Sequence, residues 1–122
     1  MHNYVLERMS HERLFLAGES AHLVAPIGAK GLNLAVHDAL LLADGIEAFY
    51  AGDEGPLAGY TEACQGRVWQ YQEFSRWLSD IFHGSPDPFV NKMFQARLRR
   101  LLGSRAAAES FAEIYIGKNA DF

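Results

Sequence analysis

The sequence is short of the features that mark several large classes of protein. Its one cysteine, Cys64, excludes an internal disulfide and any zinc site built on several cysteines, and it favours a reducing, cytoplasmic location. No apolar run approaches the length of a membrane span, and the N-terminus does not resemble a signal peptide. The net charge of −4 offers no basic excess. We therefore expect neither a membrane nor a nucleic acid as a partner.

What the sequence does contain is the composition of a folded domain. Of its 122 residues, 49% are hydrophobic and 21% are charged, which is typical of a globular chain with one modest core. Apolar residues recur at three- and four-residue spacing along most of the chain, so we predict a mostly α fold with about four helices. The expected helices run from about Gly31 to Tyr50, Leu57 to His83, Pro88 to Gly103 and Ser104 to Tyr115.

The third of these helices has clear local signals. Asp87 is predicted to cap its start, directly before a proline at the first helical position. Its core face is expected to bury Val90, Phe94, Leu98 and Leu101. The basic residues around it are interpreted as a solvated face: Arg97, Arg99, Arg100 and Arg105.

One short N-terminal strand is expected at Arg13 to Gly18. This run is almost entirely apolar and ends in glycine, which favours a strand buried on both faces, as in a parallel sheet. No partner strand can be identified elsewhere in the sequence. We therefore expect unpaired strand edges, and a homo-oligomer as a consequence.

The segment from Gly18 to Asn33 carries the most unusual pattern. It leads from the strand end through a loop into a helix start, where free backbone N–H groups and the helix dipole favour an anion. Glu19 follows the strand and could accept hydroxyl groups, and Lys30 adds a positive charge beside the helix. On these residues alone, an ordinary strand-loop-helix turn explains the pattern equally well.

Arg13 to Asp38, RLFLAGESAHLVAPIGAKGLNLAVHD, resembles the second flavin-binding motif of the single-component, FAD-dependent aromatic hydroxylases. The similarity continues through Arg67–Trp69, Phe74–Trp77 and Ala112–Gly117, so it covers almost the whole chain. The resemblance implies a fragment of an α/β flavoprotein hydroxylase fold. Residues 1–122 would form a single C-terminal part, with the strand and flavin motif in 1–33 and a helical region in 34–122.

The resemblance also implies a set of ligands and cofactor-binding residues. The complete enzyme would use FAD, NAD(P)H as co-substrate and a small aromatic substrate of the hydroxybenzoate type. Glu19 stands where the family has an aspartate that holds the ribityl hydroxyls, while the backbone N–H groups of Leu32 and Asn33 would meet the flavin's pyrimidine carbonyl. The other residues expected at the cofactor are Gly28, Lys30 and Gly31.

Two residues correspond to catalytic positions of the family. Pro26 matches a proline whose carbonyl lies near the substrate phenol. Tyr115 matches a tyrosine of the relay that removes the phenolic proton, a sensible pairing because the pKa of tyrosine, about 10, is close to that of a phenol. No metal is expected.

The sequence departs from the family pattern at several points. Glu19 is one methylene longer than the family's aspartate, and Ala25 and Ile27 replace a proline and a threonine beside the substrate. A glycine-rich dinucleotide fingerprint, the middle motif serving FAD and NADPH, and an arginine for a substrate carboxylate are absent. We therefore expect the isolated chain to be inactive and to bind FAD weakly.

Three interpretations other than a flavin-binding fragment can be considered for these residues. Ser20 and His22 do not form the nucleophile elbow of a hydrolase. His37 and Asp38 lie mid-helix without a further histidine at helical spacing, so a metal pair is disfavoured, and Asp38 is well placed to brace the loop before its helix. The alternative function is a stand-alone helical interaction or oligomerisation module that binds no flavin.

Overall fold

The computed structural model describes residues 3–117, and most of these are helical. The helices are α1 (Gly31–Tyr50), α2 (Gly55–Ala58), α3 (Tyr60–His83), α4 (Pro88–Gly103) and α5 (Arg105–Ile116). The strands are two residues each: β1 (Tyr4–Val5), β2 (Ser10–His11), β3 (Leu14–Phe15) and β4 (His22–Leu23). A short 3-10 helix, η1 (Gly18–Ser20), lies between β3 and β4. The prediction of a mostly α fold is confirmed.

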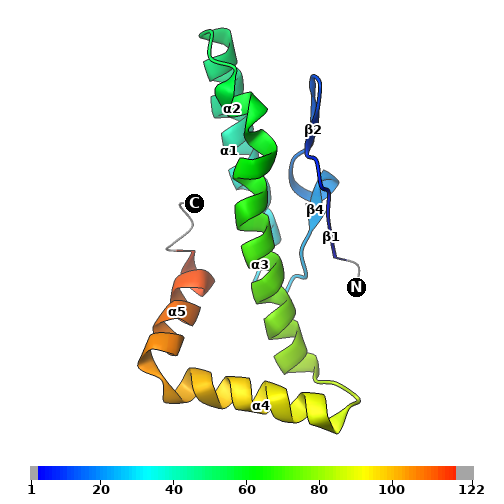
Figure 1. Ribbon diagram of the computed structural model, residues 1–122, viewed down its shortest axis with the longest axis vertical. Coiled ribbons are helices and arrows are strands. Elements are labelled where there is room, and N and C mark those ends of the chain that lie inside the picture. Colours follow the sequence, from blue (N-terminus) through cyan, green and yellow to red (C-terminus); the bar gives the residue numbers. More distant parts are fainter. Residues whose placement is uncertain (1–2, 118–122) are drawn as a thin grey trace.

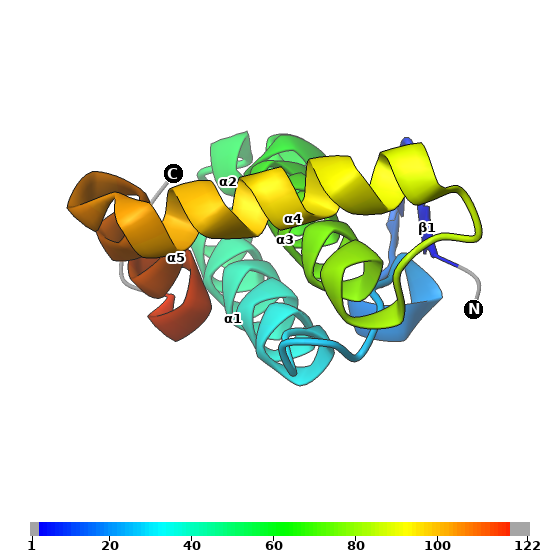
Figure 2. The ribbon, with the colours of Figure 1, turned by 90° about the horizontal axis from the view of Figure 1, so that it is seen from below.

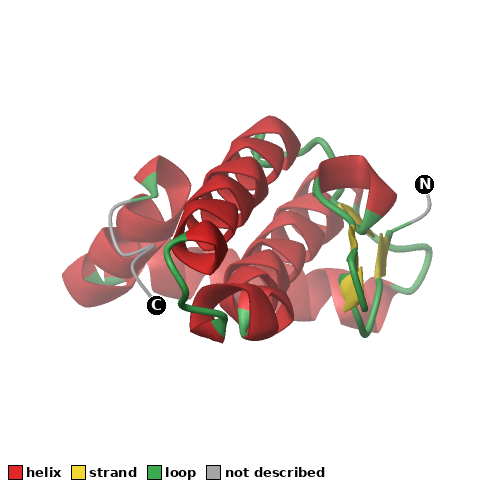
Figure 3. Ribbon diagram, turned by 90° about the horizontal axis from the view of Figure 1, so that it is seen from above, coloured by secondary structure: helices red, strands yellow, loops and turns green. Residues whose placement is uncertain are grey.

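Two long helices, α1 and α3, pack side by side and form the centre of the molecule (Figures 1 and 3). α4 crosses one end of α3, and α5 then turns back beside α3 (Figures 1 and 2). The strands lie on the opposite side of α3 from α5 (Figure 1). The chain therefore places its N-terminal strands and its last helix on two flanks of one central helix.

The expected strand at Arg13 to Gly18 is wrong in its length and its burial. Only Leu14–Phe15 of this run form a strand, β3, which pairs antiparallel with β2 in a hairpin whose turn includes Glu12 at a positive φ of 52°. Leu14 is 60% exposed, so this strand is not buried on both faces. β1 and β4 form a second antiparallel pair that the sequence did not reveal. With no parallel neighbour among residues 3–117, the apolar run pairs locally instead.

Side chains of α3 hold the strands in place. Gln72 donates from Nε2 to the carbonyl oxygen of Leu23 at 2.8 Å, and Gln65 donates from Nε2 to that of Leu6 at 2.7 Å. The amide N–H of Met9 donates to Thr61 Oγ1 at 3.2 Å. Because strands this short leave many backbone groups unpaired, these side chains substitute for missing neighbours.

The core consists of two clusters along α3. Val24 and Leu34 pack on one part of the helix, and Met9 and Ala21 on the other. The α3 residues that they meet are Val68, Tyr71, Phe74 and Leu78 in the first cluster and Tyr60 and Cys64 in the second. Cys64 is fully buried.

The expected second helix, Leu57 to His83, is broken at Gly59 into α2 and α3. Leu57 packs so closely on α1 that a Cβ at Gly45 would lie 2.8 Å from its Cδ2. This contact holds α2 against α1, and Gly59 provides the bend that lets α3 take its own direction. The hydrophobic spacing continues across the bend, which is why it predicted one helix.

α4 begins as expected but is less buried than expected. The carboxylate of Asp87 accepts from the N–H of Phe89 at 2.8 Å, which confirms the predicted cap. No residue of α4 is fully buried, and Leu98 is 37% exposed. The reason is the placement of α4, which crosses the end of α3 and contacts α5 without lying along the core (Figure 2).

Candidate functional site

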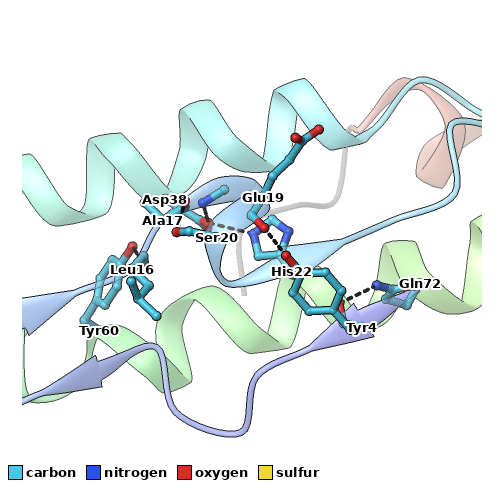
Figure 4. Close-up of polar contacts among 10 residues, drawn as sticks. Tyr4, Leu16, Ala17, Glu19, Ser20, His22, Asp38, Tyr60 and Gln72 are labelled. Atoms are coloured by element: carbon cyan, nitrogen blue, oxygen red, sulfur yellow. Dashed lines mark hydrogen bonds and ion pairs between the residues drawn. The ribbon is translucent and has the colours of Figure 1, made fainter. Parts of the chain in front are cut away.

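A buried carboxylate anchors the turn that carries Glu19. Asp38 of α1 is fully buried, and its Oδ2 accepts from the backbone N–H of Gly18 at 2.9 Å (Figure 4). The same oxygen lies 2.7 Å from Nε2 of His22, itself only 2% exposed. Asp38 therefore connects η1, β4 and α1, which agrees with the predicted bracing role.

The surroundings of Asp38 keep it ionised. Burial acts to raise the pKa of Asp38, but the hydrogen bonds from His22 and Gly18 outweigh it and leave the pKa below its usual value. Burial, together with the charge of Asp38, raises the pKa of the Cys64 thiol to about 12. Burial also raises the pKa of Tyr60. A buried carboxylate is therefore surrounded by hydrogen-bond donors and by the un-ionised side chains of Cys64 and Tyr60.

The turn itself requires glycine at position 18. Gly18 has a φ of +61°, and a Cβ built on it would lie 2.9 Å from the Cβ of Ala35 on α1. The following residue, Glu19, is exposed and extends its carboxylate away from the His22–Asp38 pair (Figure 4). The Tyr4 hydroxyl donates to the carbonyl oxygen of Glu19. The backbone of Glu19 is thus fixed while its side chain stays available to a ligand.

The next part of the site is the loop that contains Pro26. The N–H of Ala29 donates to the carbonyl oxygen of Pro26 at 3.0 Å, which closes a tight turn. Gly28 has a φ of +96°, and a Cβ built on it would lie 3.4 Å from the ring of Phe74, an ordinary contact distance. Pro26 is exposed, and its carbonyl oxygen retains a second lone pair for another donor.

The first turn of α1 is open to an acceptor. No side chain caps it, and it contains no acidic residue. The N–H of Leu34 is bonded to the carbonyl of Lys30 at 3.0 Å, so the N–H groups of Gly31, Leu32 and Asn33 precede the regular helical bonds. Leu32 is 77% exposed. The helix dipole and these donors together favour a negatively charged edge of a ligand.

Lys30 connects this loop to the last helix. Its side chain is 7% exposed, and the ammonium donates to the backbone carbonyl of Tyr115. The same ammonium lies 5.4 Å from the ring centroid of Tyr71 and 5.2 Å from that of Tyr115. Burial, with a smaller effect of Arg67, lowers the pKa of Lys30. The ammonium is directed toward α5, so a direct cofactor contact for Lys30 stays a prediction.

Tyr115 is brought close to the loop through Lys30. Its ring is 52% exposed and stacks on Phe111 at 6.0 Å between centroids. The structure therefore gathers Lys30 and Tyr115, while Glu19 sits separately on η1. Sequence reasoning missed His22 and Tyr71 as supporting residues. A signal for His22 was present, because a carboxylate on the inner side of a helix needs a charged or donating partner.

Two further features are not found within residues 3–117. No group of three or more histidine, cysteine, aspartate or glutamate side chains there could hold a metal ion. No helix of this part of the chain is both long and apolar enough to cross a membrane.

Comparison with known proteins identifies sequences that are similar to this chain. Residues 1–75 match the family model described as "FAD binding domain". The chain is 41% identical over 120 residues to p-hydroxybenzoate hydroxylase from Acinetobacter baylyi, covering 96% of this chain and 30% of that protein. It is 34% identical over 76 residues to tryptophan 2-halogenase from Chondromyces crocatus, covering 62% of this chain and 14% of that protein. The chain thus spans less than a third of either relative, and it belongs to the FAD-binding domain family.

Proposed function

We propose that this chain supplies one half of the FAD site of a flavin-dependent aromatic monooxygenase, as its C-terminal part. The observation that carries the proposal is the open first turn of α1 beside a turn that Asp38 holds and that presents Glu19 outward. In this proposal residues 1–33 provide the cofactor contacts and residues 34–122 the helical support. NAD(P)H would be the co-substrate of the complete enzyme.

Each part of the site has a distinct role in the proposal. Glu19 accepts hydrogen bonds from ribityl hydroxyls, and the N–H groups of Leu32 and Asn33 donate to the flavin's pyrimidine edge. The helix dipole stabilises negative charge at that edge by about 0.3–1 kcal/mol. Gly31, where a Cβ would meet nothing within 4 Å, lets the backbone come close to the flavin ring, and Gly28 provides the positive φ that the loop needs. When bound, FAD supplies the redox chemistry that activates dioxygen.

The substrate in this proposal is a small phenol. The carbonyl of Pro26 lies near the substrate's hydroxyl group, and Tyr115 acts as a relay: its oxygen accepts the phenolic proton while its own hydroxyl proton passes to solvent, to which Tyr115 is 52% exposed. Removing that proton makes the aromatic ring more electron-rich and therefore more readily hydroxylated. The similarity to p-hydroxybenzoate hydroxylase supports a hydroxylated benzoate as the substrate.

Flavin binding can be tested in a chimera. This chain replaces the matching segment of the Acinetobacter baylyi protein, and we expect a yellow protein that retains FAD. Glu19→Ala should weaken FAD binding about tenfold or more, because it removes charge-assisted hydrogen bonds. Glu47→Ala, on the exposed part of α1, is the matched control and should leave the affinity unchanged.

Two results would contradict the proposal. A folded chimera that stays colourless in excess FAD would show that this segment does not form part of an FAD site. If Glu19→Ala and Glu47→Ala weakened FAD binding equally, Glu19 would not be a residue that contacts FAD. We expect the chain by itself not to bind FAD tightly, and flavin retained through its purification would show that expectation to be wrong.

A second candidate function is a helical interaction module. Leu32, Val36 and Leu40 lie four residues apart on α1 and are 77%, 51% and 58% exposed, which forms an apolar stripe. We expect the chain to self-associate through this stripe, and light scattering should report a mass above one chain. Val36→Lys should restore a monomer, whereas Glu47→Lys should not. A monomer before any substitution would contradict this.

A further inference from the structure

A cleft of about 340 Å³ is lined by residues of α3, α4 and α5 and by none of the turn that carries Glu19. All three helices contribute to its lining, which combines arginine and serine side chains with aromatic rings. This volume is at the lower end of the range of small-molecule sites, so the cleft suits a ligand with a single ring.

The cleft has an excess of positive charge. Arg97 and Arg100 line it from successive turns of α4, against one carboxylate, Glu73, from α3. The ion pairs formed within residues 3–117 are His22–Asp38, Arg76–Asp80 and Arg105–Glu109. Neither lining arginine has a carboxylate partner among them. Two guanidinium groups that have no carboxylate partner within residues 3–117 favour a planar oxyanion, which each can bind through two hydrogen bonds.

The remaining walls are aromatic. Trp77 and Phe111 meet edge to face, with 5.1 Å between their ring centroids, and both line the cleft. The guanidinium of Arg97 lies 5.7 Å from the ring centroid of Trp77. The indole Nε1 of Trp77 is buried without a hydrogen-bond partner among the described residues, so Trp77 meets the cleft through its ring rather than through this donor. Ser110 adds a hydroxyl at the same cleft.

We propose that the cleft between α3, α4 and α5 binds a small aromatic carboxylate. The ring lies against Trp77 and Phe111, and the carboxylate is held by Arg97 and Arg100. Neither the uncapped start of α1 nor Glu19 takes part, so the cleft shares no lining residue with the proposed flavin contacts, although Phe111 also stacks on Tyr115. An aliphatic acid lacks the ring, and inorganic phosphate lacks it too, so both should bind more weakly.

The test uses the fluorescence of Trp77 in the whole 122-residue chain. The chain has two tryptophans, and Trp69→Phe leaves Trp77 as the single reporter. Benzoate should produce a saturable change in emission, with cyclohexanecarboxylate and inorganic phosphate weaker. The double variant Arg97→Ala/Arg100→Ala should weaken benzoate binding about tenfold or more, because it removes the charge-assisted contacts. Higher salt should also weaken binding.

Arg99→Ala is the matched control, because Arg99 lies on the same helix but does not line the cleft. Both arginines of the cleft are exposed, so the variants should keep their helical circular dichroism. An unsaturable response to benzoate, or an equal effect of Arg99→Ala, would overturn the site. Phosphate binding as tightly as benzoate would overturn its assignment to an aromatic ligand. None of these results bears on flavin binding, which the chimera tests separately.

Discussion

Replacing Asp38 with alanine is expected to lower the free energy of unfolding by about 2–6 kcal/mol, because two buried donors lose their acceptor and each such unsatisfied group costs about 1–3 kcal/mol. His22 and the N–H of Gly18 would both lose their acceptor while remaining buried. A domain of this size is stable by only about 5–15 kcal/mol, so much of the chain would unfold at moderate temperature. Urea unfolding followed by circular dichroism measures the change.

Two further measurements separate charge from shape at Asp38. Asp38→Asn keeps the size of the side chain and an acceptor for Gly18, so its cost should be smaller than that of alanine. Asp44→Ala, at an exposed position of the same helix, should cost little. If Asp38→Ala and Asp44→Ala changed the free energy of unfolding by the same amount within experimental error, the buried carboxylate would not be a stabilising feature.

The acid sensitivity of the chain should depend on the same residue. The pKa of Asp38 is lower in the folded chain than its ordinary value of 3.8. Its contribution is therefore fully present above pH 3.8 and is lost as the pH falls through the lower folded value. Asp38→Asn removes this ionisation, so that part of the acid-induced loss of stability should disappear from the unfolding curves.

Replacing Gly18 with alanine should be similarly damaging, for reasons of backbone and space. A side chain at a φ of +61° costs about 1–3 kcal/mol. The new Cβ would also lie 2.9 Å from that of Ala35, and such overpacking typically costs about 1–3 kcal/mol more. We expect the turn to move away from α1, which also displaces Glu19 and weakens FAD binding in the chimera.

Gly66→Ala is the control for this substitution. Gly66 lies within α3, and a Cβ there would meet nothing within 4 Å. Alanine at this position should stabilise the chain by roughly 0.5–1 kcal/mol, because glycine is the poorer helix former. If both glycine variants changed the urea midpoint in the same direction, the close packing of η1 on α1 would not be what requires Gly18.

The sequence predicted the helices better than the strands, for a physical reason. Helix starts such as that capped by Asp87 depend on neighbouring residues, and so does the end at Gly117, which adopts a φ of +78° as a left-handed cap. Strand pairing depends on distant partners. The run at Arg13 to Gly18 has the composition of an inner strand, but it finds only β2 beside it.

The candidate site, like the fold, could be predicted in part. The motif from Gly18 to Asn33 indicated the loop that carries Glu19 and the start of α1. It could not show where the Lys30 ammonium points, because that depends on α5, far along the chain. It also could not show that α4 lies across the end of α3, so Leu98 was wrongly expected in the core.

The contact between Lys30 and Tyr115 has a consequence for how the chain folds. It joins positions 85 residues apart, and contacts of such long sequence separation carry a high loop-closure entropy and form slowly. During synthesis, α1 and α3 can pair before α5 has left the ribosome. The loop before α1 would meanwhile hold a lysine whose acceptor has not yet been made. The loop that we propose to contact flavin is therefore completed only after Tyr115 of α5, which lies 85 residues later in the chain than Lys30, has been translated.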